Sequence, residues 1–147
     1  MIREFEEKDA KELSDLITRN IKINNSRYNV AIVDKFCRKY SPEEIIKKSK
    51  ISLIVVLEEK GKLIGTGTLE GNYINAIYIN LESQSQGFGS LILEFLEGKA
   101  KEKGESWVKL HGTRGSFGFY EKKGYVVDHI VEGKTNGKTY FMTKKLI

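Results

Sequence analysis

The sequence has one cysteine, one proline and no long hydrophobic run. The lone Cys37 cannot form a disulfide within the chain, which excludes a disulfide-stabilised scaffold and is typical of a reducing cytosol. No apolar stretch approaches the ~18 residues that a membrane helix needs. The charged start, MIREFEEKDAKEL, does not resemble a signal peptide. We therefore expect a cytoplasmic protein with no membrane partner.

Internal repeats, proline-rich linkers and low-complexity segments are also lacking in these 147 residues. The composition, 39% hydrophobic and 31% charged, is that of a globular chain long enough to bury a core. We therefore expect a single domain over residues 1–147.

The net charge of +5 favours anionic partners in general. Many lysines stand beside glutamates, as expected for a mixed-charge surface, and no segment interleaves basic with aromatic residues as a nucleic-acid face would. A nucleic-acid partner is therefore not expected. A dense acidic cluster, which a polyamine would need, is lacking too.

Apolar periodicity predicts helices in the first third of the chain, after a short strand at residues 2–5. One helix spans residues 9–21 and a second helical segment covers residues 29–40. Ser41 as N-cap and Pro42 at the first helical position mark the start of another.

Strand-like alternation then predominates, and turn signals separate the segments. Lys60-Gly61 and Asn136-Gly137 predict two hairpins. The expected strands are residues 52–59, 62–70, 72–81, 106–111, 125–132 and 138–146, with helices at 88–104 and 116–124. This order predicts an α/β fold with a mostly antiparallel sheet.

The segment QSQGFGSLILEFLEGKAKEKG, residues 84–104, places two glycines just before a helix. Glycine allows sharp turns and close approach of the backbone to a ligand. A helix start offers unpaired N–H groups and a positive dipole end, which suit phosphate. This segment predicts a phosphate-binding loop, although the glycines could instead serve only to turn the chain into the helix.

Two familiar phosphate loops do not fit. A P-loop needs a lysine before its Ser or Thr, but Ser90 directly follows Gly89. A dinucleotide fingerprint needs a third small residue where Ile92 stands, and an acid at the end of the next strand, which residues 106–111 lack.

Gln84-x-x-Gly87-x-Gly89, between a strand and an amphipathic helix, resembles the acetyl-CoA loop of the GNAT superfamily of N-acetyltransferases. FYEKKGY at residues 119–125 is similar to a further segment of that family, and the strand order matches along nearly the whole chain. The resemblance implies a mixed, mostly antiparallel sheet of six to seven strands flanked by about four helices. Strands four and five are splayed in that fold, and the pantetheine arm of acetyl-CoA fills the gap.

The resemblance also implies which residues contact the co-substrate, acetyl-CoA, and it implies no metal. Backbone groups of the fourth strand would bind the pantetheine, and the glycine loop would bind the pyrophosphate. The implied cofactor-binding residues are Ile77, Tyr78, Ile79, Gln84, Ser85, Gln86, Gly87, Phe88, Gly89, Ser90, Thr113, Tyr120 and Lys122.

Tyr120 matches the family tyrosine that faces the sulfur of coenzyme A. A phenol pKa near 10, against about 8.5 for a thiol, favours a hydrogen bond over full proton transfer. Tyr73 occupies the position of a frequent glutamate base, and Thr113 that of a frequent asparagine. Glu70 and His111 are the candidate bases, although His111 could be structural and Glu70 a hairpin-end charge.

The resemblance implies that the first two helices and the last hairpin form the acceptor groove. A polar patch of Asn24, Asn25, Arg27 and Tyr28 could line it. We expect acetyl transfer to a primary amine, in a small molecule or a protein, by direct attack within a ternary complex. One alternative is a catalytically weak CoA-binding sensor or partner module, which the missing glutamate favours; a basic nucleic-acid-binding domain is a second. Homodimers are common in the family, and the sequence leaves that question open.

Overall fold

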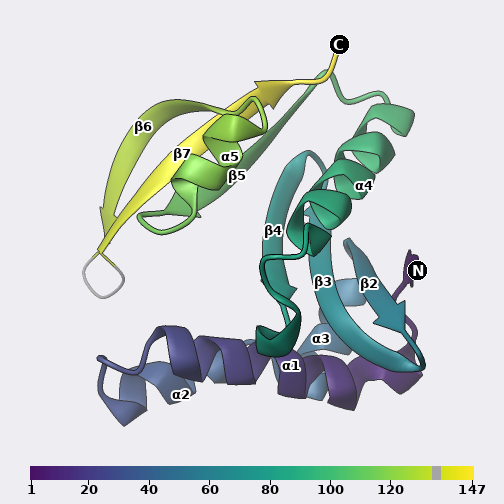
Figure 1. The fold of residues 1–147 in the computed structure, drawn as a ribbon, viewed down its shortest axis with the longest axis vertical. Coiled ribbons are helices and arrows are strands. Elements are labelled where there is room, and N and C mark those ends of the chain that lie inside the picture. The colour runs from purple at the N-terminus through teal and green to yellow at the C-terminus, as the bar shows by residue number, and fades with distance from the viewer. Residues whose placement is uncertain (134–136) are drawn as a thin grey trace.

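The computed structural model describes residues 1–133 and 137–147, and its strands form one seven-stranded sheet in the order β1-β2-β3-β4-β5-β7-β6 (Figure 1). All neighbouring strands pair antiparallel except β4 and β5, which are parallel. The strands are β1 (Ile2–Glu4), β2 (Leu53–Glu59), β3 (Lys62–Glu70), β4 (Tyr73–Ile79), β5 (Trp107–Thr113), β6 (Val126–Gly133) and β7 (Gly137–Lys145). This arrangement confirms the predicted fold class.

Helices cover both faces of the sheet and bury two apolar clusters. The α-helices of the described residues are α1 (Ala10–Asn24), α2 (Val30–Arg38), α3 (Pro42–Ser49), α4 (Phe88–Glu102) and α5 (Phe117–Lys122), with 3₁₀ turns η1 (Glu7–Asp9) and η2 (Leu81–Ser83). Val55 and Leu57 of β2 belong to the cluster that α4 covers, whereas Ile54 and Val56 belong to the cluster under α1–α3. Since β2 is buried on both faces, its sequence is a continuous apolar run.

The turn and cap signals of the sequence correspond to real element ends. Ser41 Oγ accepts the Glu44 N–H at 3.3 Å and so caps α3. Lys60 and Gly61 are left-handed, with φ of 52° and 77°, as a tight hairpin between β2 and β3 requires. Strands β6 and β7 also form the expected hairpin, with Gly133 paired to Gly137. Asn136 of its predicted turn lies outside the described residues.

Strands β4 and β5 are in register at one pair only, Tyr73 with Lys109, and then diverge (Figure 1). This confirms the predicted splay. β4 ends at Ile79, two residues earlier than expected, because the Asn80 side chain accepts the Leu81 N–H at 3.1 Å and starts η2.

A bulge in β4 changes which side chains face each layer. Ala76 is left-handed, with φ of 54°, and the register with β3 shifts between Thr66 and Thr68. As a result Ile77 packs with Ile74 in the α4 cluster, while Tyr78 faces the α1–α3 layer. Simple alternation does not predict this, because one extra residue reverses every side chain after it.

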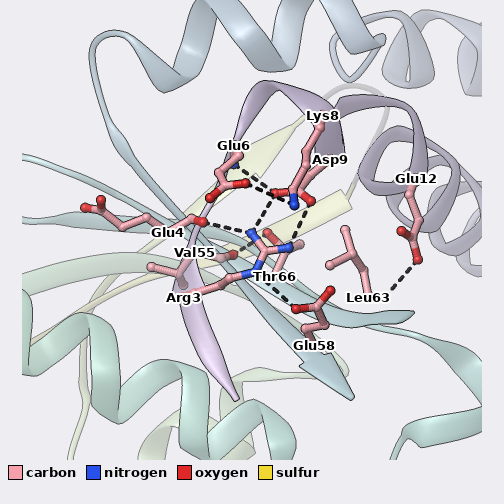
Figure 2. Close-up of polar contacts among 10 residues, drawn as sticks. All are labelled: Arg3, Glu4, Glu6, Lys8, Asp9, Glu12, Val55, Glu58, Leu63 and Thr66. Carbon is pink, nitrogen blue, oxygen red and sulfur yellow. Dashed lines mark hydrogen bonds and ion pairs between the residues drawn. The ribbon is translucent and has the colours of Figure 1, made fainter. Parts of the chain in front are cut away.

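Arg3 of β1 forms ion pairs with Asp9 of η1 and with Glu58 of β2 (Figure 2). Its guanidinium donates to both oxygens of Asp9, at 2.8 and 3.0 Å, and to Glu58 at 3.2 Å. Asp9 also accepts the Glu6 N–H at 2.8 Å. The Arg3 guanidinium is the main reason that the pKa of the buried Asp9 carboxyl lies below its usual range. These contacts join β1, the turn before α1, and β2.

Candidate active site

A cavity of about 690 Å³ lies where β4 and β5 separate. It brings together most of the residues that the sequence predicted for the co-substrate and for catalysis. Those lining it are Ile77, Tyr78, Ile79, Gln84, Ser85, Gly87, Phe88, Gly89, Ser90, His111, Thr113 and Tyr120. Gln86 and Lys122 are exposed and lie outside the lining, as does Glu70.

The glycine loop leaves the start of α4 open toward this cavity. Ser85 and Gly87 are both left-handed, with φ of 65° and 86°, and Gly87 is the N-cap, with no side-chain cap bond. Successive N–H groups in such a turn converge on one point and suit an anion. A Cβ on Gly89 would meet only Phe119 Cζ, at 3.8 Å. The space at Gly89 is therefore available to a ligand.

Gln84 fastens the loop to the end of β4. Its side-chain amide donates to the Ile79 carbonyl at 3.2 Å and to Asn20 Oδ1 at 3.5 Å. Asn20 belongs to α1 and is 2% exposed. The conspicuous glutamine of the motif is thus engaged within the protein and positions the loop.

The backbone of β4 past the bulge is paired on one edge. Tyr78 pairs with Thr66 and Ile79 with Gly65, both in β3. On the other edge, no strand among the described residues pairs with Ile77–Ile79. Backbone groups left in this state can bind an extended ligand as a further strand would.

Thr113 ends β5 in a compact turn. Its N–H donates to Ser116 Oγ at 2.8 Å, and the two hydroxyls lie 2.9 Å apart. The turn leads directly into α5, which places Tyr120 on the cavity wall.

Tyr120 packs edge-on against Phe119 and Tyr125, with ring centroids 5.2 and 5.8 Å away. No hydrogen bond from its hydroxyl to another described residue is formed. Burial raises the pKa of Tyr120 to about 12. Its hydroxyl therefore stays protonated at neutral pH and can donate to a ligand in the cavity.

Tyr73 and His111 face each other across the two strands, with Tyr73 Oη 3.1 Å from His111 Nδ1. The His111 ring also meets the edge of Phe141, at 5.3 Å. Burial, helped by His129 and Lys109, lowers the pKa of His111. The imidazole is therefore neutral at pH 7 and can accept a proton. Although the sequence singled out both residues, it gave no sign of their contact.

The other titratable candidates do not line this cavity. Glu70 is the cross-strand partner of Tyr73, but its carboxylate forms an ion pair with Lys48 at 3.1 Å. His129 bonds to Asp128 at 2.7 Å and stacks on Phe141. Cys37 packs in the α1–α3 layer, where burial raises the pKa of its thiol.

A second cavity, of about 350 Å³, lies between α1, α3 and the sheet. Asn75 and Ala76 of the β4 bulge line both cavities. The sequence did not predict this cavity, because its walls come from four segments that are far apart in the chain. Of the predicted polar patch, Asn24 lines the larger cavity, whereas the Asn25 amide donates to the Ile21 carbonyl at 2.8 Å.

No helix within residues 1–133 and 137–147, the part of the chain that the structure describes, combines the length and apolar character needed to cross a membrane. No group of three or more His, Cys, Asp or Glu side chains within them is arranged to hold a metal ion.

The fold is similar to several solved acetyltransferases. A GCN5-related N-acetyltransferase from Rhodopseudomonas palustris matches with a TM-score of 0.87 and 17% identity, over 99% of this chain and 94% of that one. The PaiA N-acetyltransferase from Thermoplasma acidophilum, in complex with coenzyme A, matches with a TM-score of 0.83 and 23% identity, over 99% of this chain and 98% of that one. The aminoglycoside 6'-N-acetyltransferase from Enterococcus faecium matches with a TM-score of 0.77 and 16% identity, over 100% of this chain and 97% of that one.

No curated protein sequence matches the chain significantly. The profile of the acetyltransferase (GNAT) domain, however, matches residues 17–146. That range runs from α1 to the end of β7 and includes the glycine loop, the splayed strands and Tyr120. Since the profile matches most of the sequence, the chain belongs to the GNAT acetyltransferase family.

Proposed function

We propose that residues 1–147 form a single domain that transfers an acetyl group from acetyl-CoA to a primary amine by direct attack in a ternary complex. The observation that carries this proposal is the 690 Å³ cavity between β4 and β5, with an anion-binding loop beside it and Tyr120, Tyr73 and His111 on its walls. The coenzyme A bound to the PaiA neighbour supports the assignment of the co-substrate.

The loop and β4 bind the two ends of the co-substrate. The N–H groups of residues 85–90 receive the pyrophosphate at the positive end of α4. The free edge of Ile77–Ile79 binds the pantetheine, and one N–H there polarises the thioester carbonyl. Lys122 and Gln86 are exposed near this region and are proposed only as outer contacts.

Acetyl-CoA supplies an acetyl thioester whose carbonyl carbon the amine attacks. Tyr120 donates its hydroxyl proton in a hydrogen bond to the departing sulfur. Its pKa of about 12 is above that of a thiol, so Tyr120 stabilises the thiolate without giving up its proton. The raised pKa of the Cys37 thiol, and its place outside the cavity, favour direct attack over an acetyl-cysteine route.

The amine attacks in its neutral form, after its ammonium has lost one proton to solvent, and the proton that it sheds on attack leaves through Tyr73 and His111. Tyr73 Oη accepts it while the phenol's own proton passes to His111 Nδ1, 3.1 Å away. A neutral phenol and an imidazolium result. Because the amine loses its basicity as it attacks, the proton moves to His111 during bond formation rather than before it. Glu70, paired with Lys48, is the weaker candidate for this role.

Calorimetric titration with acetyl-CoA and with desulfo-CoA, followed by acetylation assays on a panel of amines, tests this function. We expect micromolar binding of both nucleotides and release of free coenzyme A that depends on the amine. Binding without turnover on any amine would instead favour a CoA-binding sensor module, and no binding would exclude both.

The proton route predicts a specific loss in His111→Gln. We expect kcat to fall about 100-fold with unchanged CoA affinity, as for loss of a general base. In the wild type the limb of the kcat profile that reports His111 should lie below pH 6.5, since the pKa of His111 is lowered, and His111→Gln should lack this limb. His129→Gln is the matched control, because it stacks on the same Phe141 ring outside the cavity. Equal effects of both variants would contradict the role of His111.

A further inference from the structure

The second cavity, between α1, α3 and the sheet, has an apolar interior and a charged mouth. Its buried apolar lining includes Leu13, Ile17, Ile45 and Ile54, all under 7% exposed. Lys39 and Lys47 line it too, and both are exposed. The buried residues therefore mark the floor and the lysines mark the opening.

The charges at the opening leave a surplus of one cation. Three lysines line it, and two of them have acidic partners: Lys47 pairs with Glu44 at 3.4 Å and Lys48 with Glu70 at 3.1 Å. Lys39 has no acidic partner within 4.0 Å among the described residues. Such a mouth repels a polycation and attracts a single anionic group.

The floor of this cavity adjoins the proposed reaction site. Asn75 and Ala76 line both cavities, and Tyr73, two residues before Asn75, contacts His111. A ligand that enters past the lysines and reaches Asn75 thus presents its inner end where the amine must lie. The volume of about 350 Å³ is at the low end for ligand sites, which favours a small molecule over a polypeptide.

We propose that this cavity binds the acceptor, and that the acceptor is a small primary amine whose apolar body separates the amino group from a carboxylate. This inference rests on the proposed function. The amine lies at the β4 bulge, the apolar body lies against Ile45 and Ile54, and the carboxylate is next to Lys39. Polycationic amines such as spermidine are poor acceptors in this arrangement.

Three amines of graded charge test the substrate class: 4-(aminomethyl)benzoate, 4-methylbenzylamine and spermidine. We expect kcat/KM to be about fivefold higher for the benzoate than for 4-methylbenzylamine, as for one partly exposed ion pair. Spermidine should be the poorest of the three. Equal values for the three amines, or a preference for spermidine, would overturn the inference while leaving acetyl transfer established.

A charge reversal at the mouth tests the binding mode. Lys39→Glu should lower kcat/KM for 4-(aminomethyl)benzoate at least about fivefold and leave 4-methylbenzylamine unaffected. Lys35→Glu is the matched control, since Lys35 is exposed in α2, four residues earlier, and outside the cavity. Both variants change the net charge equally, so an equal effect of the two would overturn the role of Lys39.

A binding measurement separates this inference from the proposed chemistry. In the complex with coenzyme A, 4-methylbenzoate, which lacks the amine, should shift the methyl NMR signals of Ile45 and Ile54 and should bind more weakly to Lys39→Glu. If no amine is acetylated but these shifts occur, the proposed transfer fails and the cavity assignment holds. If amines are acetylated and the shifts are missing, the cavity assignment fails alone.

Discussion

Gly89 lies at the point where the first turn of α4 faces the proposed pyrophosphate site. Its Cβ would meet nothing closer than Phe119 Cζ at 3.8 Å, so a side chain there leaves the fold unstrained. Gly89→Glu should weaken CoA binding about 100-fold or more, because like charges in contact cost several kcal/mol. Isothermal titration measures the loss.

Gly98→Glu is the control for this substitution. Gly98 belongs to the same helix, is exposed, and has no atom within 4 Å of its added Cβ. It should bind coenzyme A as the wild type does. A Gly89→Glu protein that is folded and still binds normally would show that the loop turns the chain and holds no phosphate.

Tyr120 provides the second residue-scale prediction. Removing its hydroxyl in Tyr120→Phe takes away the hydrogen bond to sulfur and leaves the packing against Phe119 and Tyr125. We expect kcat to fall about 10- to 100-fold, with the dissociation constant of CoA nearly unchanged. Steady-state kinetics beside calorimetry separates the two. Parallel losses in both quantities would assign Tyr120 to binding and packing.

At the scale of elements, the sequence predicted what local chemistry determines. The cap at Ser41, the turn at Lys60-Gly61 and the glycine loop before α4 each follow from a few adjacent residues. The bulge at Ala76 does not, because alanine carries no signal for a left-handed conformation. The Tyr73–His111 contact joins two residues that are 38 positions apart in the sequence, and it depends on how β4 and β5 diverge. Local sequence therefore does not predict it.

The packing of α4 on β3 determines where the loop lies. A Cβ on Gly67 would be 2.6 Å from Ile92 Cγ2 and 2.9 Å from Leu96 Cδ1, so the helix rests directly on the glycine backbone. Gly67→Ala should therefore destabilise the fold by about 1–3 kcal/mol through overpacking. It should also weaken CoA binding, because α4 moves together with its N-terminal loop.

Urea unfolding measures this change, and Gly98→Ala provides the contrast. That substitution lies on the exposed face of α4 and should stabilise the fold by about 0.5–1 kcal/mol, since alanine favours helix over glycine. If Gly67→Ala lowers the free energy of unfolding and Gly98→Ala raises it, the destabilisation arises in the contact between α4 and β3. A neutral Gly67→Ala would mean that Ile92 and Leu96 can shift without cost.

For the molecule as a whole, the N-terminal ion cluster holds α1 against the sheet at a distance from the chemistry. Arg3 joins Asp9 to Glu58 of β2, and Glu12 of α1 accepts the Leu63 N–H of β3 at 2.8 Å (Figure 2). The same helix carries Asn20 and Asn24 to the larger cavity and Leu13 to the smaller one. Both cavities therefore depend on a contact made at the chain's first residues.

The pH dependence of stability should show this cluster. The pKa of Asp9 is lower in the folded state than the usual value near 3.9, so its contribution is present above pH 4 and is lost as the pH falls through the folded value. Asp9→Asn should cost about 2 kcal/mol at pH 7, as for a hydrogen bond between charged groups. The difference from the wild type in the free energy of unfolding, measured with urea, should shrink toward pH 3.

Asp15→Asn is the control, because it loses only an exposed ion pair with Lys11. Its free energy of unfolding should stay within about 0.5 kcal/mol of the wild-type value at both pH values. If the free energies of unfolding of the wild type and of Asp9→Asn differ by the same amount at pH 3 and pH 7, Asp9 stabilises the fold by shape rather than by charge.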